Sequence, residues 1–163
     1  MKIRFSFLML FTFLSIQLFA QPFGSEYDNA DGTSMVPIKM DAEAYMEVFE
    51  SEGYEIVRME LDILLTNKET FRTLQDGWSY GIFAFGDYRF EKIDLRVYKM
   101  VEGEWIELYE GDDQMGYEAI EGTNSVLIKL IPEVSAEYKF RVEALEYSEG
   151  YSGGHYGLFV FHE

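Results

Sequence analysis

Acidic side chains gather in the middle of the chain, and they are the first residues whose type and spacing suggest chemistry. Five carboxylates fall between positions 110 and 121: Glu110, Asp112, Asp113, Glu118 and Glu121. Calcium takes six to eight oxygen ligands, many from carboxylates and carbonyls of an irregular loop, and the loop 111–116 has that composition. If Asp94 lies across a hairpin from this loop, Asp94, Asp112 and Asp113 are the candidate calcium ligands. The alternative is a solvated acidic surface, which 30 Asp and Glu residues would produce in any case.

The same carboxylates could also serve as the acid and base of a glycosidase. That mechanism needs two carboxyl groups about 5–9 Å apart across a cleft, one of them with a raised pKa. One small domain with a single short helix has little room for such a cleft. Because the chain has 30 Asp and Glu residues, two carboxylates close together in the sequence are not evidence for a catalytic pair. Cys is absent, which excludes a thiolate nucleophile. His155 and His162 are seven positions apart, and this odd spacing puts them on opposite faces of a strand, where they cannot bind one metal ion together. We therefore expect a protein that is not an enzyme.

A loop near the C-terminus combines glycine and serine with aromatic rings. Exposed Tyr and Trp rings suit the recognition of sugars or proteins, because they offer an apolar face together with a polar group. Tyr147, Tyr151 and His155 are therefore the candidate ligand-binding residues. Two tryptophans could add further flat surfaces: Trp78 and Trp105. The alternative is that these rings belong to the core and that the glycines serve turns.

The composition excludes several partners. The net charge is −17 at pH 7, from 13 Lys and Arg against 30 Asp and Glu. Nucleic acid and anionic lipid surfaces both attract proteins through positive charge, so neither is an expected partner. Aromatic residues make up 17% of the chain, which supplies enough apolar surface to argue against disorder. Because Cys is absent, the fold depends on packing and not on disulfides.

The beginning of the chain has the layout of a secretory signal. Lys2 and Arg4 precede an apolar run at 5–19, and Ala20 offers a small residue for cleavage. The run is shorter than the ~20 residues of a membrane-spanning helix. We therefore expect cleavage after Ala20, a secreted or periplasmic protein, and no membrane span after cleavage. The alternative is an uncleaved membrane anchor.

Two segments follow the predicted signal peptide at 1–20: a flexible leader at 21–37 and one domain at 38–163. The leader is polar and contains glycine and proline, as linkers do. Its sequence DNADG, at 28–32, has the composition of a calcium loop. No Glu closes that loop at its twelfth position, so we interpret the segment as linker.

The domain begins with one predicted helix, at 41–52. Asp41 is placed to cap its N-terminus and Gly53 to cap its C-terminus. Tyr45 and Phe49 belong to one apolar stripe at helical spacing. We expect this helix to pack over an end or an edge of the remaining domain.

After the helix the apolar period changes to two, which is the period of strands. Nine strands are predicted: 54–65, 69–75, 78–85, 93–101, 104–109, 117–121, 125–131, 137–145 and 155–162. In the first of them, one face is expected to be buried: Val57, Met59, Leu61, Ile63 and Leu65. Many short strands separated by turn residues favour an antiparallel sandwich over a parallel sheet with crossover helices. The sequence therefore predicts an all-β, antiparallel jelly-roll-like β-sandwich with one N-terminal helix.

Four short segments occur in a characteristic order: GIFAFG at 81–86, IDLRVY at 93–98, AEYKFRV at 136–142 and YGL at 156–158. Together they resemble the bacterial pre-peptidase C-terminal (PPC) domain, over roughly 41–161. The resemblance implies a secreted jelly-roll-like sandwich that is a non-catalytic module with a binding or stabilising role. The chain departs from the pattern at Lys92, where some relatives carry an acidic residue, and in having no cysteines.

These observations lead to one functional expectation and two alternatives. We expect a non-catalytic secreted or periplasmic binding module that recognises a protein or a glycan through its end loops. The first alternative is a structural component of a cell-surface complex that pairs an edge strand with its partner. The second is a domain that calcium stabilises.

Overall fold

The computed structural model describes residues 34–120 and 123–162. The predicted signal peptide, the DNADG segment and all but the last four residues of the predicted leader lie outside these ranges. Within them the chain forms α1 (Val36–Ser51), β1 (Glu55–Leu64), β2 (Asn67–Leu74), β3 (Tyr80–Gly86), β4 (Phe90–Val101), β5 (Glu104–Glu107), η3 (Asp112–Gln114), β6 (Gly116–Ala119), β7 (Ser125–Leu130), β8 (Ala136–Tyr147) and β9 (Gly154–His162). No helix in the described ranges is long and apolar enough to cross a membrane.

The strands form two antiparallel sheets that pack face to face. The first has the order β1-β9-β3-β7-β6 and the second the order β2-β8-β4-β5. Apart from the edge strand β6, each sheet has four strands, and consecutive strands mostly alternate between the sheets, as in a jelly roll. Side chains from both inner faces form the larger core, among them Ile82, Leu95, Phe140 and Leu158. The structure therefore confirms the predicted all-β, jelly-roll-like sandwich with one N-terminal helix.

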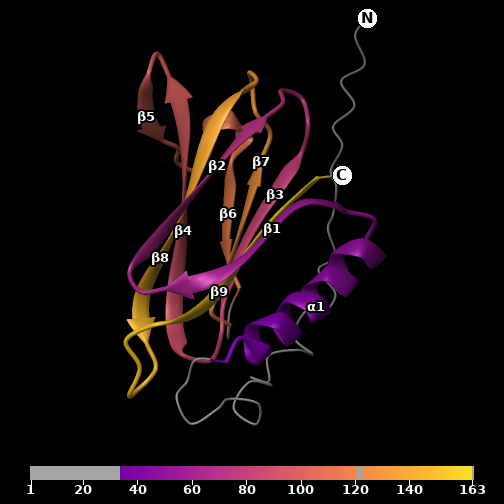
Figure 1. Ribbon diagram of the computed structural model, residues 1–163. Coiled ribbons are helices and arrows are strands. Elements are labelled where there is room, and N and C mark those ends of the chain that lie inside the picture. Colours follow the sequence, from indigo (N-terminus) through magenta and orange to yellow (C-terminus); the bar gives the residue numbers. More distant parts are fainter. Residues whose placement is uncertain (1–33, 121–122, 163) are drawn as a thin grey trace, which may run out of the picture.

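Helix α1 lies against the outer face of the five-stranded sheet, so the domain has three layers (Figure 1). That face presents Phe83 and Phe85 from β3 and Phe159 and Phe161 from β9. The ring centre of Phe49, on α1, is 4.4 Å from that of Phe161. The helix therefore covers a face and not the predicted end or edge. The reason is that the outward positions of β3 and β9 are aromatic, which leaves both strands buried on two sides.

Helix α1 also begins five residues earlier than the predicted start at 41. Its first turn contains Pro37, whose fixed φ suits a helix start, and the residue before the helix is Met35. Asp41 is therefore inside the helix and is not its N-cap, three residues from the buried Ile38. Burial and the charge of Asp87 raise the pKa of Asp41 from 3.8 to about 6.

The two faces of β1 differ from the prediction. Leu64 is buried, whereas Met59 and Ile63 are half exposed. The pairing with β9 is irregular between Ile56 and Arg58, and such a bulge transfers every following side chain to the other face. The prediction is wrong for three residues after the bulge that it placed in the core: Met59, Ile63 and Leu65.

The four-stranded sheet has an open outer face. In the described part of the chain, α1 packs on the other sheet, and no helix lies over β2, β8, β4 and β5 (Figure 1). The register aligns Phe71, Lys139 and Tyr98 in one row across this face. It aligns Glu69 and Arg141 in the next row. The side chains in these two rows therefore lie on the outer face of the sheet and are not part of the core.

Candidate functional site

Three aromatic rings and one lysine form the centre of the open face. Phe71, Lys139 and Tyr98 come from β2, β8 and β4, and Trp105 comes from β5. The Nζ atom of Lys139 is 4.3 Å from the ring centre of Tyr98 and 5.4 Å from that of Trp105. At these distances the ammonium is attracted to the electron-rich faces of both rings. We name the group Phe71, Tyr98, Trp105 and Lys139 the aromatic platform.

Two rings of the aromatic platform, those of Phe71 and Trp105, lie close to each other across the sheet. Phe71 and Trp105 belong to the two edge strands, yet their ring centres are only 5.4 Å apart. Neighbouring strands are about 4.8 Å apart, so side chains from opposite edges meet only when they extend over β8 and β4. The side chain of Lys139 is therefore only 13% exposed, whereas Phe71 remains 47% exposed. The result is an apolar surface that solvent can reach, in which the ring planes of Phe71 and Trp105 are tilted by 50° to each other.

Charged side chains border the aromatic platform. The carboxylate of Glu143 is 2.8 Å from Nε of Arg141 and 3.3 Å from Nε of Arg96. On the β2 side, the carboxylate of Glu69 is 3.2 Å from Nζ of Lys139. These ion pairs hold guanidinium and carboxylate groups in place beside the rings. Because the arginines are about one third to two fifths exposed, they still have N–H groups for a ligand.

The open face continues into a groove at the side of the sandwich. Strand β5 pairs only with the part of β4 from Tyr98 onward, so the earlier part of β4 borders an opening with a volume of about 510 Å³. The floor of this groove is apolar and includes the buried side chains of Leu95 and Met115. Its rim is polar and aromatic: Asp94, Arg96, Glu107, Tyr109, Glu110 and Tyr117. Arg96 and Glu107 lie between the groove and the aromatic platform, so the two are continuous.

A hydrogen bond joins the two sheets across this groove. The hydroxyl of Tyr117, on β6, donates to Asp94, on β4, over 3.0 Å. Burial, together with the carboxylate of Asp94, raises the pKa of Tyr117 to about 12. The phenol therefore keeps its proton at neutral pH and remains a donor. Tyr109 is 65% exposed and Tyr117 is 45% exposed, so both rings are accessible to a ligand.

The predicted calcium ligands have different partners in the structure. Asp94 lies 3.3 Å from Nε of Arg96, in addition to its bond with Tyr117. Asp112 accepts a hydrogen bond of 2.8 Å from the backbone N–H of Tyr109. Among residues 34–120 and 123–162, no three Asp, Glu or His side chains are grouped as they would be to hold a metal ion. Stabilisation by calcium stays a prediction.

Asp113, the third of these residues, is engaged in the interior. Nζ of Lys99 is 2.8 Å from each of its carboxylate oxygens, and the hydroxyl of Tyr138 donates to one of them over 2.6 Å. Burial raises the pKa of Asp113, but the hydrogen bonds from Lys99 and Tyr138 outweigh burial and hold this pKa below its ordinary value. The carboxylate therefore acts as an internal anchor between β4, β8 and the loop that contains η3.

The three residues predicted to bind a ligand do not form one exposed surface. The hydroxyl of Tyr147 donates to the backbone oxygen of Leu65, which fixes the ring in place. Tyr151 is 39% exposed, and its ring meets the edge of Tyr88. His155 is buried, with 3% of its surface exposed. Of the three, Tyr151 is exposed, Tyr147 is partly buried and His155 is buried.

His155 belongs to a buried polar cluster that it forms with Asp87 and Arg89. The guanidinium of Arg89 contacts the Asp87 carboxylate, and the His155 backbone N–H donates to the same carboxylate over 3.1 Å. The backbone N–H of Asp87 donates to the carbonyl of His155 over 2.9 Å. All three side chains are at most 4% exposed, so we interpret this cluster as a structural link between the β3–β4 turn and β9.

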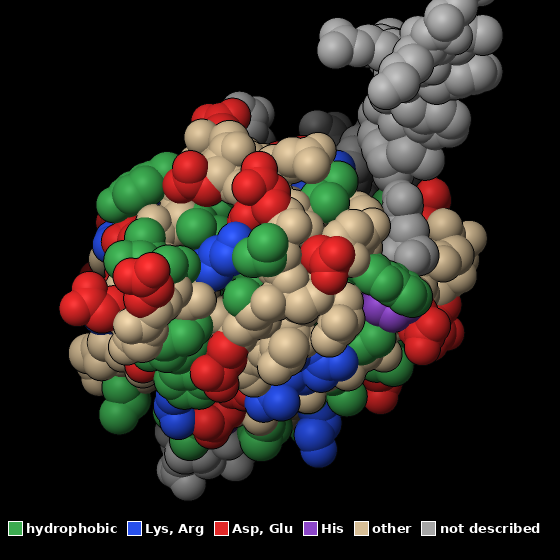
Figure 2. All heavy atoms as spheres, turned by 90° about the horizontal axis from the view of Figure 1, so that it is seen from above, with side chains coloured by type: hydrophobic (Ala, Val, Ile, Leu, Met, Phe, Trp, Pro, Cys, Tyr) green, Lys and Arg blue, Asp and Glu red, His purple; other side chains and the backbone are tan. Residues whose placement is uncertain are grey.

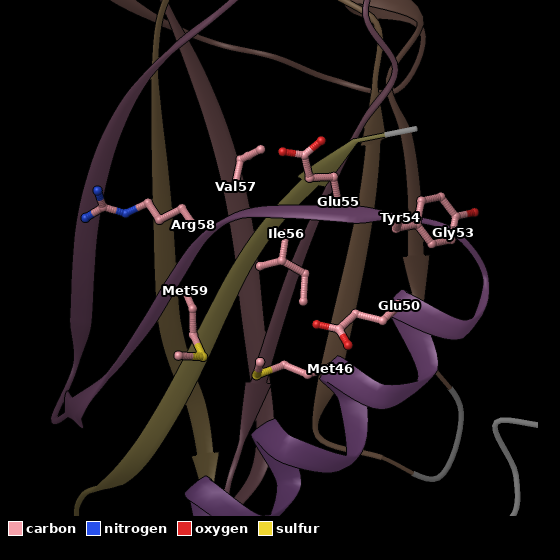
Figure 3. A pocket seen from close by; sticks show the side chains of 9 residues that line it. All are labelled: Met46, Glu50, Gly53, Tyr54, Glu55, Ile56, Val57, Arg58 and Met59. Carbon is pink, nitrogen blue, oxygen red and sulfur yellow. The ribbon is translucent and has the colours of Figure 1, made fainter.

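A second groove, with a volume of about 540 Å³, lies between α1 and β1 (Figure 3). Met46 and Glu50 line it from the helix, and Ile56 points toward the helix from β1. Val57 points to the other side of the strand and packs against the larger core. This groove has no ring cluster comparable with the aromatic platform, so we rank it second as a ligand site.

The surrounding surface is acidic. Asp and Glu side chains are spread over the end of the molecule that Figure 2 shows, with Lys and Arg between them. The net charge of −17 repels anionic ligands at long range. Anionic ligands are therefore poor candidates for the open face.

No protein-family model matches this chain, and no curated protein matches it in sequence. The class of protein is defined by its fold and site: a jelly-roll sandwich with a helix on one sheet and an aromatic surface on the other. The resemblance to PPC domains stays a prediction.

Sequence reasoning named one ring of the aromatic platform, Trp105, and missed Phe71, Tyr98 and Lys139. The available signal was alternation, since Phe71 and Tyr98 each follow a buried residue and lie two positions after a charged residue of the same face, Glu69 and Arg96. Alternation assigns a face to each residue, but it does not tell which strands are neighbours. The cross-strand register that gathers these rings became evident only with the fold.

Proposed function

We propose that this protein is a non-catalytic module that recognises a glycan through the aromatic platform. The observation that carries this proposal is the gathering of Phe71, Tyr98 and Trp105 on the open sheet face. Sugar rings have C–H groups on their faces and hydroxyls at their edges. They can stack on flat aromatic rings while neighbouring carboxylate and guanidinium groups bind the hydroxyls. Glu69 and Arg141 would supply these groups, since they lie in the row next to Phe71, Lys139 and Tyr98.

A glycan fits this face better than a protein does. Stable protein interfaces cover about 800 Å² on each partner and centre on water-excluded apolar anchors. The aromatic platform is a small group of rings bordered by ion-paired, partly exposed charges. A ligand rich in hydroxyls can satisfy those charges without excluding water from them. Export of the protein, which the layout of 1–20 predicts, would place it where polysaccharides occur.

Retention by polysaccharides tests the proposal. The protein is run through native gels that contain soluble xylan, mannan, starch or mixed-linkage glucan, and it is mixed with cellulose and chitin in sedimentation assays. We expect retention by at least one of these, and we expect Trp105→Ala to abolish it. Trp78→Ala is the matched control, because Trp78 is 48% exposed but packs beside His162 on the other sheet. Equal losses in both variants, or no retention by any polysaccharide, would contradict the proposal.

A second candidate function, assembly with other copies through β1, has its own supporting observation. Strand β1 is an edge strand of ten residues, and Met59 and Ile63 on it are 50% and 51% exposed. Exposed apolar edge strands are templates for pairing with another chain. Sedimentation velocity at high salt, which screens the repulsion between acidic copies, tests this role. A dimer that Ile63→Lys disrupts would support it, and a monomer at all concentrations would contradict it.

A further inference from the structure

We infer that the ligand is a linear oligosaccharide chain that lies along β5, from the aromatic platform into the neighbouring groove, and not a single terminal sugar. This inference rests on the proposed glycan recognition and adds the length and direction of the ligand. It follows from the positions of three residues that alternate along one segment of the chain.

Trp105, Glu107 and Tyr109 mark the path of the ligand. Alternate residues of an extended segment lie on the same side, about 6.6 Å apart for each pair of residues. The segment stays extended beyond β5, since the N–H of Leu108 donates to the carbonyl of Val97 over 2.9 Å. Trp105 and Tyr109 are therefore about 13 Å apart along the strand, which is longer than one sugar ring.

The groove end of this path has the parts of a second sugar subsite. The exposed rings of Tyr109 and of Tyr117, which is on β6, both line the groove. The Arg96 guanidinium, 3.7 Å from the Glu107 carboxylate, lies between this groove and the platform. Donors and acceptors for hydroxyl groups are thus present along the whole path, with a ring at each end.

The shape of the surface also favours a chain over a chain end. A site for a terminal sugar is closed around one ring, whereas the aromatic platform lies on an open sheet face. The groove alone has a volume of about 510 Å³, which is within the range of complete small-molecule sites. Platform and groove together therefore exceed what one sugar occupies.

Titration calorimetry with oligosaccharides of increasing length tests the inference. The probes are the disaccharide, tetrasaccharide and hexasaccharide series of cellulose, xylan, mannan and chitin. For the series that binds, we expect affinity to rise about three- to tenfold from the disaccharide to the hexasaccharide, because an additional stacked ring contributes that much. Tyr109→Ala should remove this gain while disaccharide binding at the platform persists. Tyr109→Phe, which keeps the ring, should restore most of it.

Two controls separate this inference from the proposal beneath it. Trp105→Ala should weaken every length, and Tyr151→Ala, which changes an exposed tyrosine at a distant loop, should weaken none. Equal affinity for short and long probes would overturn the linear-chain inference and leave glycan recognition standing, as would unchanged hexasaccharide binding in Tyr109→Ala. If the unmodified protein binds none of the probes, glycan recognition itself fails, and the inference fails with it.

Discussion

Nη1 of Arg89 lies 2.8 Å from Nδ1 of His155, inside one end of the sandwich. Nδ1 of His155 also lies 3.2 Å from the carboxylate of Asp87, so this ring nitrogen faces both a guanidinium and a carboxylate. The same guanidinium contacts the Asp87 carboxylate. One buried cation therefore bridges an imidazole and a carboxylate from two segments that are far apart in the sequence.

Removal of one charge from this cluster should cost much stability. In Asp87→Asn the buried guanidinium of Arg89 loses its counter-ion but keeps a side chain of nearly the same shape. We expect a loss of about 3 kcal/mol in the free energy of unfolding, as for other broken buried pairs. Urea unfolding followed by tryptophan fluorescence measures it.

Asp62→Asn is the matched control for that prediction. Asp62 is 2.6 Å from Nζ of Lys68, but both side chains are more than two fifths exposed. Exposed ion pairs contribute at most about 1 kcal/mol, so the control should lose little. If the two variants lose the same amount, the buried cluster does not have the structural role assigned to it.

Local patterns in the sequence were sufficient for the fold class but not for this cluster. Alternation and turn residues predicted each strand, because apolar periodicity and turn-forming residues are local properties of the sequence. His155 was a candidate ligand-binding residue because it belongs to a loop rich in glycine and tyrosine. Its partner Arg89 is 66 positions earlier, and only the pairing of β3 with β9 brings the two together.

The candidate site could not be predicted from local patterns either, because it depends on the cross-strand register. A single irregularity after Ile56 exchanged the two faces of β1, which no count of apolar residues could reveal. The aromatic platform depends on the order β2-β8-β4-β5, in which the neighbours of β8 are not its neighbours in the sequence. Trp105 was recognised as a possible platform residue by its type alone. Phe71, Tyr98 and Lys139 could be grouped with it only once the strand order was known.

Asp41 should make the stability of the protein depend on pH. Its pKa is raised from 3.8 to about 6, first by burial and second by the charge of Asp87, so the folded state favours the protonated form. The stabilising contribution of this proton is fully present below pH 4 and is lost as pH rises through 6. Asp41→Asn cannot ionise, so it should become more stable than the unmodified protein above pH 6, by about 1–2 kcal/mol at this half-buried site.

The measurement for Asp41 is the difference in unfolding free energy between variant and unmodified protein at several pH values. This difference cancels the other carboxyl groups that titrate in the same range. Glu43→Gln changes an exposed carboxyl on the same helix and serves as the control, with an expected effect within about 0.5 kcal/mol. A difference for Asp41→Asn that is constant from pH 4 to pH 7 would rule out the assigned cause.

A side chain at Gly157 should destabilise the protein, because the ring of Phe85 occupies the space where that side chain would begin. Phe85 pairs with Gly157 across β3 and β9, and a Cβ atom at position 157 would lie 2.1 Å from the ring. The ring cannot move away, since it is 1% exposed and its centre is 4.8 Å from that of Tyr45 on α1. We expect Gly157→Ala to reduce the free energy of unfolding by about 1–3 kcal/mol through overpacking.

Gly116→Ala provides the comparison that isolates this overpacking. A Cβ atom at position 116 would meet no atom within 4 Å, and the backbone there has no positive φ. This alanine should leave stability unchanged or raise it by up to about 1 kcal/mol, because it restricts the unfolded chain. Urea midpoints measure both variants, and near-ultraviolet circular dichroism reports whether the rings beneath α1 have moved. Similar midpoints for Gly157→Ala and Gly116→Ala would mean that the contact between Phe85 and Gly157 does not limit the packing of the helix on the sheet.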